Sequence, residues 1–451
     1  MFRSFILLCL IFCTIDQLSA QNLSARAVND DLKYLYSQLR ELHPGINRYT
    51  PADSMNYFFK SMEADEELAE LELFARVRFL LSKVRCGHTN ASLPMDQYEK
   101  FVSERRFIPL MVGFSGTDLY ITNAELTKGK LNAGDRILSI NGREVGEVVA
   151  TIFQYLPSDG FIKTGKYRYV ENFFYYYHQL FVDNQKSFVV EVRDVNGKLK
   201  EVEISGVELR EVEALRVTDN EPFMSMVNEA DYSLMRIRTF SSSALNQQGV
   251  NYERFLSKSF DELKEKSVKN LILDLRGNGG GDDNYGATLV SYFSDKPFRY
   301  FDNIQVTDSY DGYGRISERG GVRFMTSHKG LDEWKPQKNR FSGKVIVLTD
   351  GFSFSTCADV AAVLHHNKWA IFVGEETGGG YDGNTSGSTQ TIKLPNSNIQ
   401  VRVPMWMYTT ANVGHEFHGR GVIPDFPIQY GIEDLLNDRD PVMKKALELI
   451  K

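Results

Sequence analysis

The segment Val345-Ile-Val-Leu-Thr-Asp-Gly-Phe-Ser-Phe-Ser-Thr-Cys-Ala-Asp359 decides the fold of the C-terminal half of this chain. It begins with a run of apolar and β-branched residues, which is typical of a strand buried on both faces. A turn rich in Gly and Ser follows at once, and a helix is predicted from Ala358 to His365. A strand that leads through a tight turn into a helix is the building unit of an α/β sheet.

Working outward, the flanking sequence repeats this pattern. Lys269 to Leu275 is a second apolar run, it ends in a Gly-rich turn, and a helix is predicted from Asp283 to Phe293. Trp369 to Val373 is a third predicted strand, and Thr391 to Val403 is typical of a hairpin. From residue 222 onward the pattern therefore predicts a partly parallel α/β sheet.

The N-terminal half has two different patterns. Residues 26–86 show helical spacing, with predicted helices that start at Asn29, Asp53 and Leu68. Residues 100–205 contain short strand-like runs separated by tight turns, together with a long aromatic-rich helix. Because 451 residues are too many for one hydrophobic core, we expect an α/β multidomain protein. The predicted parts are an N-terminal helical domain at 21–98, a β-rich domain at 99–210 and an α/β domain at 211–451.

The first twenty residues are typical of a secretory signal peptide. Arg3 precedes an apolar run from Phe5 to Cys13, and small residues at Leu18-Ser-Ala20 predict cleavage after Ala20. This pattern predicts an exported chain, either periplasmic or secreted, and no later segment is apolar enough to span a membrane. The formal net charge of −7 argues against nucleic acid as a partner, because phosphate binding needs a basic face.

Ser355 is a candidate nucleophile because it stands where the strand turns into the helix. A hydroxyl at a helix start lies near backbone N–H groups that can stabilise an oxyanion. The alternative is that Ser353 or Ser355 simply caps the helix, a common role for serine. On this segment alone the cap remains the commoner explanation.

Two other segments could contribute to such a site. Leu271 to Gly281 ends in Gly-Gly-Gly, which allows close backbone approach and could supply further amides, but it lacks the lysine of a phosphate loop. His88, in Cys86-Gly-His-Thr89, has a side chain suited to general base catalysis near neutral pH. No His, Cys or acidic spacing predicts a metal site, and no cofactor is expected.

Taken in order, these segments resemble the C-terminal processing, or tail-specific, serine protease family, which includes the core of the tricorn protease. The matching features are a helical segment that ends in Gly-His, a PDZ-like stretch and the two Gly/Ser-rich turns. The PDZ-like stretch runs from Leu131 to Val145, and Val373-Gly-Glu375 and Gly421-Val-Ile-Pro-Asp425 complete the order. The resemblance covers nearly the whole predicted mature chain. It implies a PDZ-like middle domain and a catalytic domain of the ClpP/crotonase-like kind.

The resemblance implies an endopeptidase without cofactors, with Ser355 as nucleophile and Ser353 as the alternative in register. Gly279 or Gly280, with the amide of Thr356, would form the oxyanion hole. One branch of the family uses a lysine about 25 residues after the serine, but Gly380 stands there. The tricorn-like branch uses a histidine before the PDZ domain, and His88 fits that place.

The resemblance also implies a partner for the histidine and a possible pairing of the cysteines. Glu375 and Glu416 are candidates to orient the imidazole of His88, although His418 occupies what is often an acidic position. If His88 and Ser355 meet, Cys86 and Cys357 come close too. They would then form a disulfide or, the favoured alternative, remain two buried thiols.

The PDZ-like domain implies a peptide or protein partner, and domains of this kind can bind a partner through its C-terminus. The competing interpretation is a catalytically inactive protein on the same scaffold that binds a peptide or a small ligand. The sequence does not indicate the oligomeric state.

Overall fold

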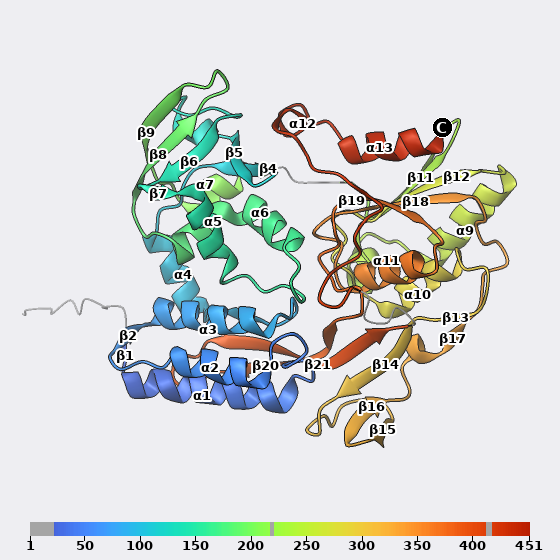
Figure 1. The fold of residues 1–451 in the computed structure, drawn as a ribbon, viewed down its shortest axis with the longest axis horizontal. Coiled ribbons are helices and arrows are strands. Elements are labelled where there is room, and N and C mark those ends of the chain that lie inside the picture. The colour runs from blue at the N-terminus through green and yellow to red at the C-terminus, as the bar shows by residue number, and fades with distance from the viewer. Residues whose placement is uncertain (1–21, 217–220, 412–416) are drawn as a thin grey trace, which may run out of the picture.

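The structure is a computed structural model that describes residues 22–216, 221–411 and 417–451. The predicted signal peptide at 1–20 and the candidate Glu416 lie outside the described residues. Figure 1 shows three parts: N-terminal helices, a middle sheet flanked by helices, and a larger C-terminal part built on a central sheet. This arrangement confirms the predicted α/β multidomain class.

The central sheet has the strand order β10-β11-β12-β18-β19-β22. Only β10 and β11 are antiparallel, and the other neighbours are parallel, as the sequence predicts. The strands are β10 (Met224–Asn228), β11 (Ser233–Ile237), β12 (Asn270–Asp274), β18 (Lys344–Thr349), β19 (Ile371–Gly374) and β22 (Phe426–Pro427). The helices of this part are α8 (Ser242–Gln247), α9 (Tyr252–Glu265), α10 (Asp283–Ser291), α11 (Thr356–His366), α12 (Ile432–Leu436) and α13 (Pro441–Ile450).

Both faces of the central sheet are covered, which explains why its strands are continuously apolar. Because side chains alternate along a strand, Leu271 and Leu273 join the core formed with α9, α10 and α11. Ile272 points the other way, into a smaller core with Val442 and Ala446 of α13. The carboxyl ends of β12 and β18 therefore lie side by side, in register from Asn270↔Lys344 to Asp274↔Leu348.

A second sheet connects the C-terminal part to the N-terminal helices. Its order is β15-β16-β14-β21-β20, and β3 pairs with β21 at its other end. The hairpin predicted near Pro395–Asn398 is confirmed as β20 and β21. The strands are β3 (Asn90–Ser92), β14 (Phe301–Val306), β15 (Ile316–Arg319), β16 (Val322–Met325), β20 (Thr385–Lys393) and β21 (Gln400–Thr410). Two short pairs, β1 (Asn22–Leu23) with β2 (Leu68–Ala69) and β13 (Phe298–Arg299) with β17 (Glu333–Trp334), lie outside these sheets, and η2 spans Lys329–Leu331.

The middle part has a hydrophobic core of its own, formed by residues between Phe101 and Val212. Its sheet has the order β4-β5-β6-β8-β9, with β7 paired to β6. The elements are β4 (Met111–Ser115), β5 (Asp118–Asn123), η1 (Glu125–Thr127), β6 (Arg136–Ile140), β7 (Arg143–Glu144), α5 (Val145–Phe153), α6 (Thr164–Phe181), β8 (Ser187–Arg193), β9 (Leu199–Ser205) and α7 (Leu209–Glu213). The domain boundaries at 98/99 and 210/211 stay a prediction.

The first three N-terminal helices share a continuous core with the C-terminal part, whereas Phe101 of the fourth belongs to the core of the middle part. The helices are α1 (Ala25–Leu42), α2 (Ala52–Ser61), α3 (Glu70–Val84) and α4 (Met95–Glu104). Buried side chains of α1 and α3 belong to the same cluster as Ile392, Val401 and Val403 of the hairpin. In Figure 1 the hairpin extends from the C-terminal part alongside these helices.

The start of α1 differs from the prediction for a physical reason. The helix begins at Ala25, and the hydroxyl of Ser24 accepts a hydrogen bond from the amide of Ala27. Asn29, predicted to cap the helix, instead exchanges two hydrogen bonds with the backbone of Ala64. Asn29, which resembles a cap in the sequence, therefore lies inside the helix and connects it to the segment around Ala64.

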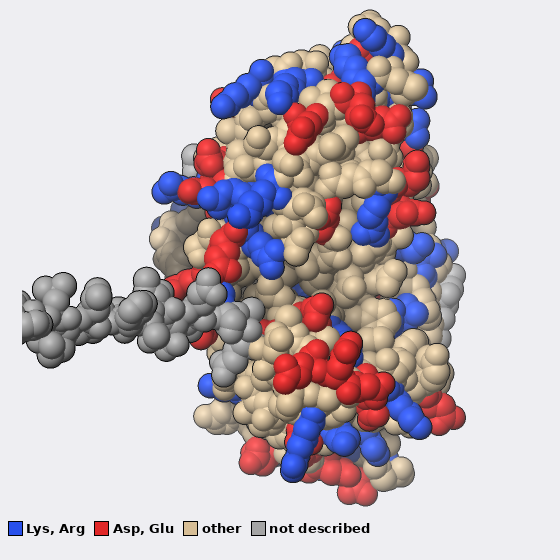
Figure 2. Space-filling view, turned by 90° about the vertical axis from the view of Figure 1, so that its left-hand side faces the viewer, with Lys and Arg blue, Asp and Glu red and all other residues tan. Residues whose placement is uncertain are grey.

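The surface and the helices add two further observations. On the face shown in Figure 2, acidic and basic side chains are interspersed. Within the described residues, no helix combines the length and the apolar character that crossing a membrane requires.

Asp31 ties α1 to the hairpin, and its removal should destabilise the fold. Its buried carboxylate accepts hydrogen bonds from the amides of Asn396 and Ser397 and from the Asn396 side chain. Asp31→Ala leaves the two backbone amides unpaired, so we expect a loss of about 2–4 kcal/mol in the free energy of unfolding. Urea denaturation measures the loss. The neighbouring Asp30→Ala removes only an exposed pair with Arg26 and should cost about 0.5 kcal/mol or less. Equal losses in the two variants would contradict this role.

Candidate active site

Ser355 has a backbone conformation that a helix cap does not have. It directly precedes α11 with φ 56° and ψ −134°, and its side chain makes no capping hydrogen bond. A capping serine has a negative φ, and its hydroxyl accepts from an amide of the first turn. A positive φ at a residue with a side chain is strained, and such strain is characteristic of turns that present a nucleophile.

The hydroxyl of Ser353 is used to hold the turn in place. It is fully buried, and its hydroxyl donates to the carbonyl of Leu275 at 3.0 Å and accepts from the amide of Asp350 at 3.1 Å. These bonds fix the turn after β18 against the end of β12. The hydroxyl of Ser353 is thus engaged, whereas the half-buried Ser355 presents its hydroxyl without such bonds.

The predicted Gly-rich loop packs directly against Ser355. Gly280 has φ 93°, and a Cβ atom at this position would lie 2.7 Å from the Cβ of Ser355 and 3.0 Å from the amide nitrogen of Thr356. The amide of Gly280 already donates to Asn278 Oδ1 at 2.9 Å. Across the described ranges, no hydrogen bond satisfies the amides of Gly279 and Thr356. These two amides are therefore available to a ligand at Ser355.

His88 lies beside the nucleophile turn. Its ring stacks on the ring of Phe354, the residue before Ser355, with centroids 4.5 Å apart. Burial, with smaller effects of the charges at Arg402 and His43, lowers the pKa of His88 to about 3, so the imidazole is neutral at ordinary pH. Among the residues that the structure describes, no hydrogen bond joins His88 to Ser355. The two side chains are brought to one region but are not in contact as a dyad.

Asp159, which the sequence did not single out, lies next to His88. Its Oδ1 accepts the amide of Gly87 at 2.7 Å, while its Oδ2 is buried without a hydrogen-bond partner in the described part of the chain. A carboxylate oxygen of Asp159, a ring nitrogen of His88 and the Sγ of Cys86 all lie within 4.8 Å of one another. Burial is the main reason that the pKa of Asp159 is raised to about 6. Ser158-Asp-Gly160 reads as an ordinary turn, so only the fold reveals this neighbour.

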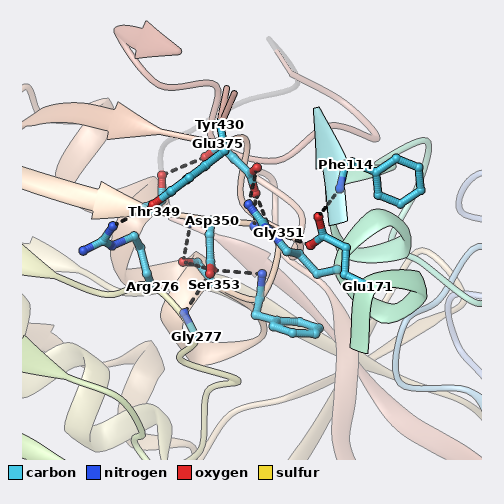
Figure 3. Close-up of polar contacts among 12 residues, drawn as sticks. Phe114, Glu171, Arg276, Gly277, Thr349, Asp350, Gly351, Ser353, Glu375 and Tyr430 are labelled. Carbon is cyan, nitrogen blue, oxygen red and sulfur yellow. Dashed lines mark hydrogen bonds and ion pairs between the residues drawn. The ribbon is translucent and has the colours of Figure 1, made fainter. Parts of the chain in front are cut away.

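Glu375, a predicted partner of His88, binds an arginine instead. Both of its carboxylate oxygens accept from Arg168 of α6, at 2.5 and 3.0 Å, and one also accepts the amide of Gly351. Figure 3 shows Glu375 next to Gly351, in the turn that leads to Ser353. Glu416, the other candidate, lies outside the described residues.

Arg168 extends this network to the edge of the middle sheet. It also pairs with Glu171 at 2.7 Å, and Glu171 accepts the backbone amide of Phe114 in β4 at 2.9 Å. Burial and the two carboxylates oppose each other at Arg168, and the net effect raises the pKa of its guanidinium, so it is cationic. A chain of charge-assisted contacts thus runs from β4 to the nucleophile turn.

The loop around Gly380 leaves no room for the lysine of the other family branch. A Cβ at Gly380 would lie 2.6 Å from the carbonyl oxygen of Gly383, and one at Gly379 would lie 2.9 Å from the amide nitrogen of Ser355. Nearby, His418 hydrogen-bonds Asp382 at 2.7 Å, and Arg48 pairs with the same carboxylate. The absence of a lysine at 380 is therefore matched by backbone packing at that position.

Cys86 and Cys357 are both free and buried. The thiol of Cys86 donates to the carbonyl of Thr385, and that of Cys357 donates to the carbonyl of Leu275. The disulfide considered from the sequence is therefore wrong, and the alternative of two buried thiols is confirmed. The thiols face different strands, although the residues beside them converge on one site.

A pocket of about 270 Å³ opens beside the nucleophile turn. It joins the Gly-rich loop, the residue before Ser355, the residue before His88 and the start of α6. Its lining residues are Gly87, Pro157, Ser158, Ile162, Gly165, Tyr169, Gly277, Gly279, Gly351, Phe352, Phe354 and Gly378. The lining carries no charged side chain, so the pocket suits an apolar group.

Residues 231–428 match the family model of peptidase family S41. Carboxy-terminal processing protease CtpA of Bacillus subtilis (strain 168) is 26% identical over 196 residues, which cover 44% of this chain. The match spans 36% of the length of that protein, about a third of it.

Two solved structures resemble this one over almost its whole length. Mature CPAF complexed with lactacystin has a TM-score of 0.66 at 14% identity and covers 95% of this chain and 98% of its own. A putative peptidase from Parabacteroides merdae ATCC 43184 has a TM-score of 0.51 at 19% identity and covers 95% and 97%. At these identities the likeness establishes a shared fold.

The two serines of the turn should differ in their effect on stability. Ser353→Ala leaves the amide of Asp350 unpaired and removes one of the donors to the carbonyl of Leu275, so we expect a loss of about 1–3 kcal/mol in the free energy of unfolding. Ser355→Ala removes no hydrogen bond and keeps the same backbone, so its unfolding should match that of the wild type within about 0.5 kcal/mol. Thermal and urea unfolding measure both. A larger loss in Ser355→Ala than in Ser353→Ala would reverse the structural assignment.

Proposed function

We propose, from the premise that residues 231–428 form a domain of peptidase family S41, that this chain is a serine peptidase with Ser355 as nucleophile. The observation that supports Ser355 is its strained, uncapped position beside the amides of Gly279 and Thr356. Ser353 is a poor candidate because its hydroxyl is buried and bonded on both sides. The Oγ of Ser355 attacks a peptide carbonyl, and the two amides stabilise the oxyanion that forms.

His88 is the proposed general base. It takes the proton of Ser355 during attack and passes it to the leaving amine, and the same steps with water then release the acyl group. The burial that keeps its ring neutral keeps the base form available. The ring now stacks on Phe354, so catalysis requires a rotation of the imidazole toward Ser355 when substrate binds. Asp159 is the proposed positioning residue, because its carboxylate is next to His88 and stabilises the imidazolium.

The pocket beside Ser355 is the proposed site for a substrate side chain. Ile162, Tyr169 and Phe352 line it, so we infer a preference for an apolar residue next to the scissile bond. A charged side chain would lose its hydration there without gaining a partner.

The middle part is the proposed PDZ-like peptide-binding domain. β4 is an edge strand, and the outward amide of Phe114 is held by Glu171. A substrate peptide that adds a strand to β4 brings its own carbonyl to this amide and displaces Glu171. Glu171 and Glu375 both bind Arg168. When a peptide displaces Glu171, the position of Arg168, and with it that of Glu375 at the nucleophile turn, would change.

We further propose that the chain is exported, which rests only on the signal-peptide pattern at residues 1–20.

A fluorescent phosphonate that reacts with activated serines tests the function. We expect the wild-type protein to be labelled at one site, Ser355→Ala to lose the label and Ser353→Ala to keep it. His88→Ala should slow labelling by at least about a hundredfold, since the base contributes factors of that order. Peptide mapping of the adduct identifies the residue. A folded wild-type protein that is not labelled would favour the inactive binding protein instead.

Arg168 should control the rate at Ser355 although it lies outside the pocket of the nucleophile. In Arg168→Ala, Glu375 loses its partner and no longer holds Gly351 in place, so we expect labelling at least about tenfold slower. Stopped-time labelling of the two proteins gives the ratio. Arg136→Ala is the matched control, because it removes an arginine pair with Asp118 in the same part of the chain. Similar rates in all three proteins would disconnect the middle part from catalysis.

A further inference from the structure

We propose that Cys86, His88 and Asp159 form a zinc site, and that zinc bound there switches off the peptidase by occupying His88. The binding half of this inference rests on the geometry of three side chains. The regulatory half rests on the proposed function, in which His88 is the general base.

The three side chains converge from two distant segments. Cys86 and His88 stand on the turn after α3, and Asp159 comes from the loop between α5 and α6. Their ligand atoms lie within 4.8 Å of one another. A tetrahedral zinc ion at bond lengths of about 2.0–2.3 Å places its ligand atoms about 3.3–3.8 Å apart. Small side-chain rotations therefore suffice to close the three atoms around an ion.

Two buried polar atoms in this cluster have no hydrogen-bond partner among the residues that the structure describes. Asp159 is 2% exposed, and its Oδ2 has no hydrogen bond, although its Oδ1 is fixed by the amide of Gly87. The Nδ1 of His88 is likewise buried without a partner. Unsatisfied polar atoms of this kind are costly in a folded protein, and a bound ion is one way to satisfy them.

The donor set suits zinc rather than a hard cation. A thiolate, an imidazole and a carboxylate are zinc ligands, and with three of them the fourth position remains open to water. The thiol of Cys86 releases its proton to solvent on binding, so thiolate and carboxylate together balance the charge of the ion. The nearby Arg48 pairs with Asp382 at 3.3 Å, and its charge also acts on the carboxylate of Asp159.

The cluster adjoins the proposed substrate pocket. Gly87, between the two N-terminal ligands, lies on the pocket wall together with Phe354 and Gly279. An ion can therefore reach the cluster along the route that a substrate side chain uses. A zinc-bound imidazole has committed a lone pair and is held at the cluster, so it cannot rotate to take the proton of Ser355.

Cobalt binding tests the site without any need for activity. Co²⁺ replaces Zn²⁺ in such sites, and a cysteine ligand produces a thiolate-to-cobalt charge-transfer band in the near ultraviolet. We expect one equivalent of Co²⁺ to produce the band in wild-type protein and in Ser355→Ala, and Zn²⁺ to abolish it. Cys86→Ala should lose the band, while Cys357→Ala, which removes the other buried thiol, should keep it. Asp159→Asn should weaken Co²⁺ binding at least tenfold.

Several results would overturn the site. These are no band in native wild-type protein, a band that survives in Cys86→Ala, or one that depends on Cys357. Should Cys86→Ala fail to fold, the wild-type titration and Asp159→Asn still decide the question.

Phosphonate labelling then tests regulation. We expect Zn²⁺ to slow labelling of the wild-type protein and EDTA to restore it. Asp159→Asn labels more slowly without zinc, so each protein is compared with its own zinc-free rate, and at least tenfold more Zn²⁺ should be needed to halve that rate in Asp159→Asn. Slowing that needs the same zinc concentration in both proteins would reject regulation through this site. If the chain is not a peptidase, labelling fails and the cobalt band remains. If the metal inference is wrong, labelling proceeds and the band is absent.

Discussion

The close packing of Gly-rich backbone around Ser355 is the constraint on which the rest of the site depends. The parallel strands β12 and β18 end side by side, so the loops that follow them must share a small space. Gly280 fits there because a Cβ would meet Ser355 and Thr356, and Gly379 fits for the same reason on the other side. The strained φ of Ser355 persists because this surrounding structure fixes it.

The residues that fix the position of this turn are different from the groups that would react with a substrate. Ser353 and Asp350 join the turn to the ends of the strands, and Glu375 joins it to Arg168. None of these groups needs to touch a substrate. Because this frame is rigid, the hydroxyl of Ser355 and two nearby amides remain unpaired in the described structure. A more flexible turn would rearrange so that these groups bond to one another.

The N-terminal helices contribute residues to the candidate site. They share a core with the β20–β21 hairpin, and Asp31 fixes them to its turn. This docking brings His88 to Phe354 and places Asp159 behind it. In the proposed mechanism the base comes from the opposite end of the chain, so activity would depend on this long-range packing. The proposed metal ion and the proposed peptide would act at the two places where separate parts of the chain meet, beside His88 and at the Arg168–Glu375 pair.

The sequence by itself determined the elements whose signals are local. The strands at Lys269–Leu275 and Lys344–Thr349, the hairpin near Pro395 and the turn at Ser355 follow from apolar runs and Gly/Ser patterns, because these report the burial and backbone geometry of neighbouring residues. Only the tertiary structure decided the partners. It gave Glu375 to Arg168, kept Cys86 and Cys357 apart and set Asp159 beside His88, although 71 residues separate the last two in the chain. Such choices depend on how separate elements pack, and the spacing of residues within one segment carries no information about that packing.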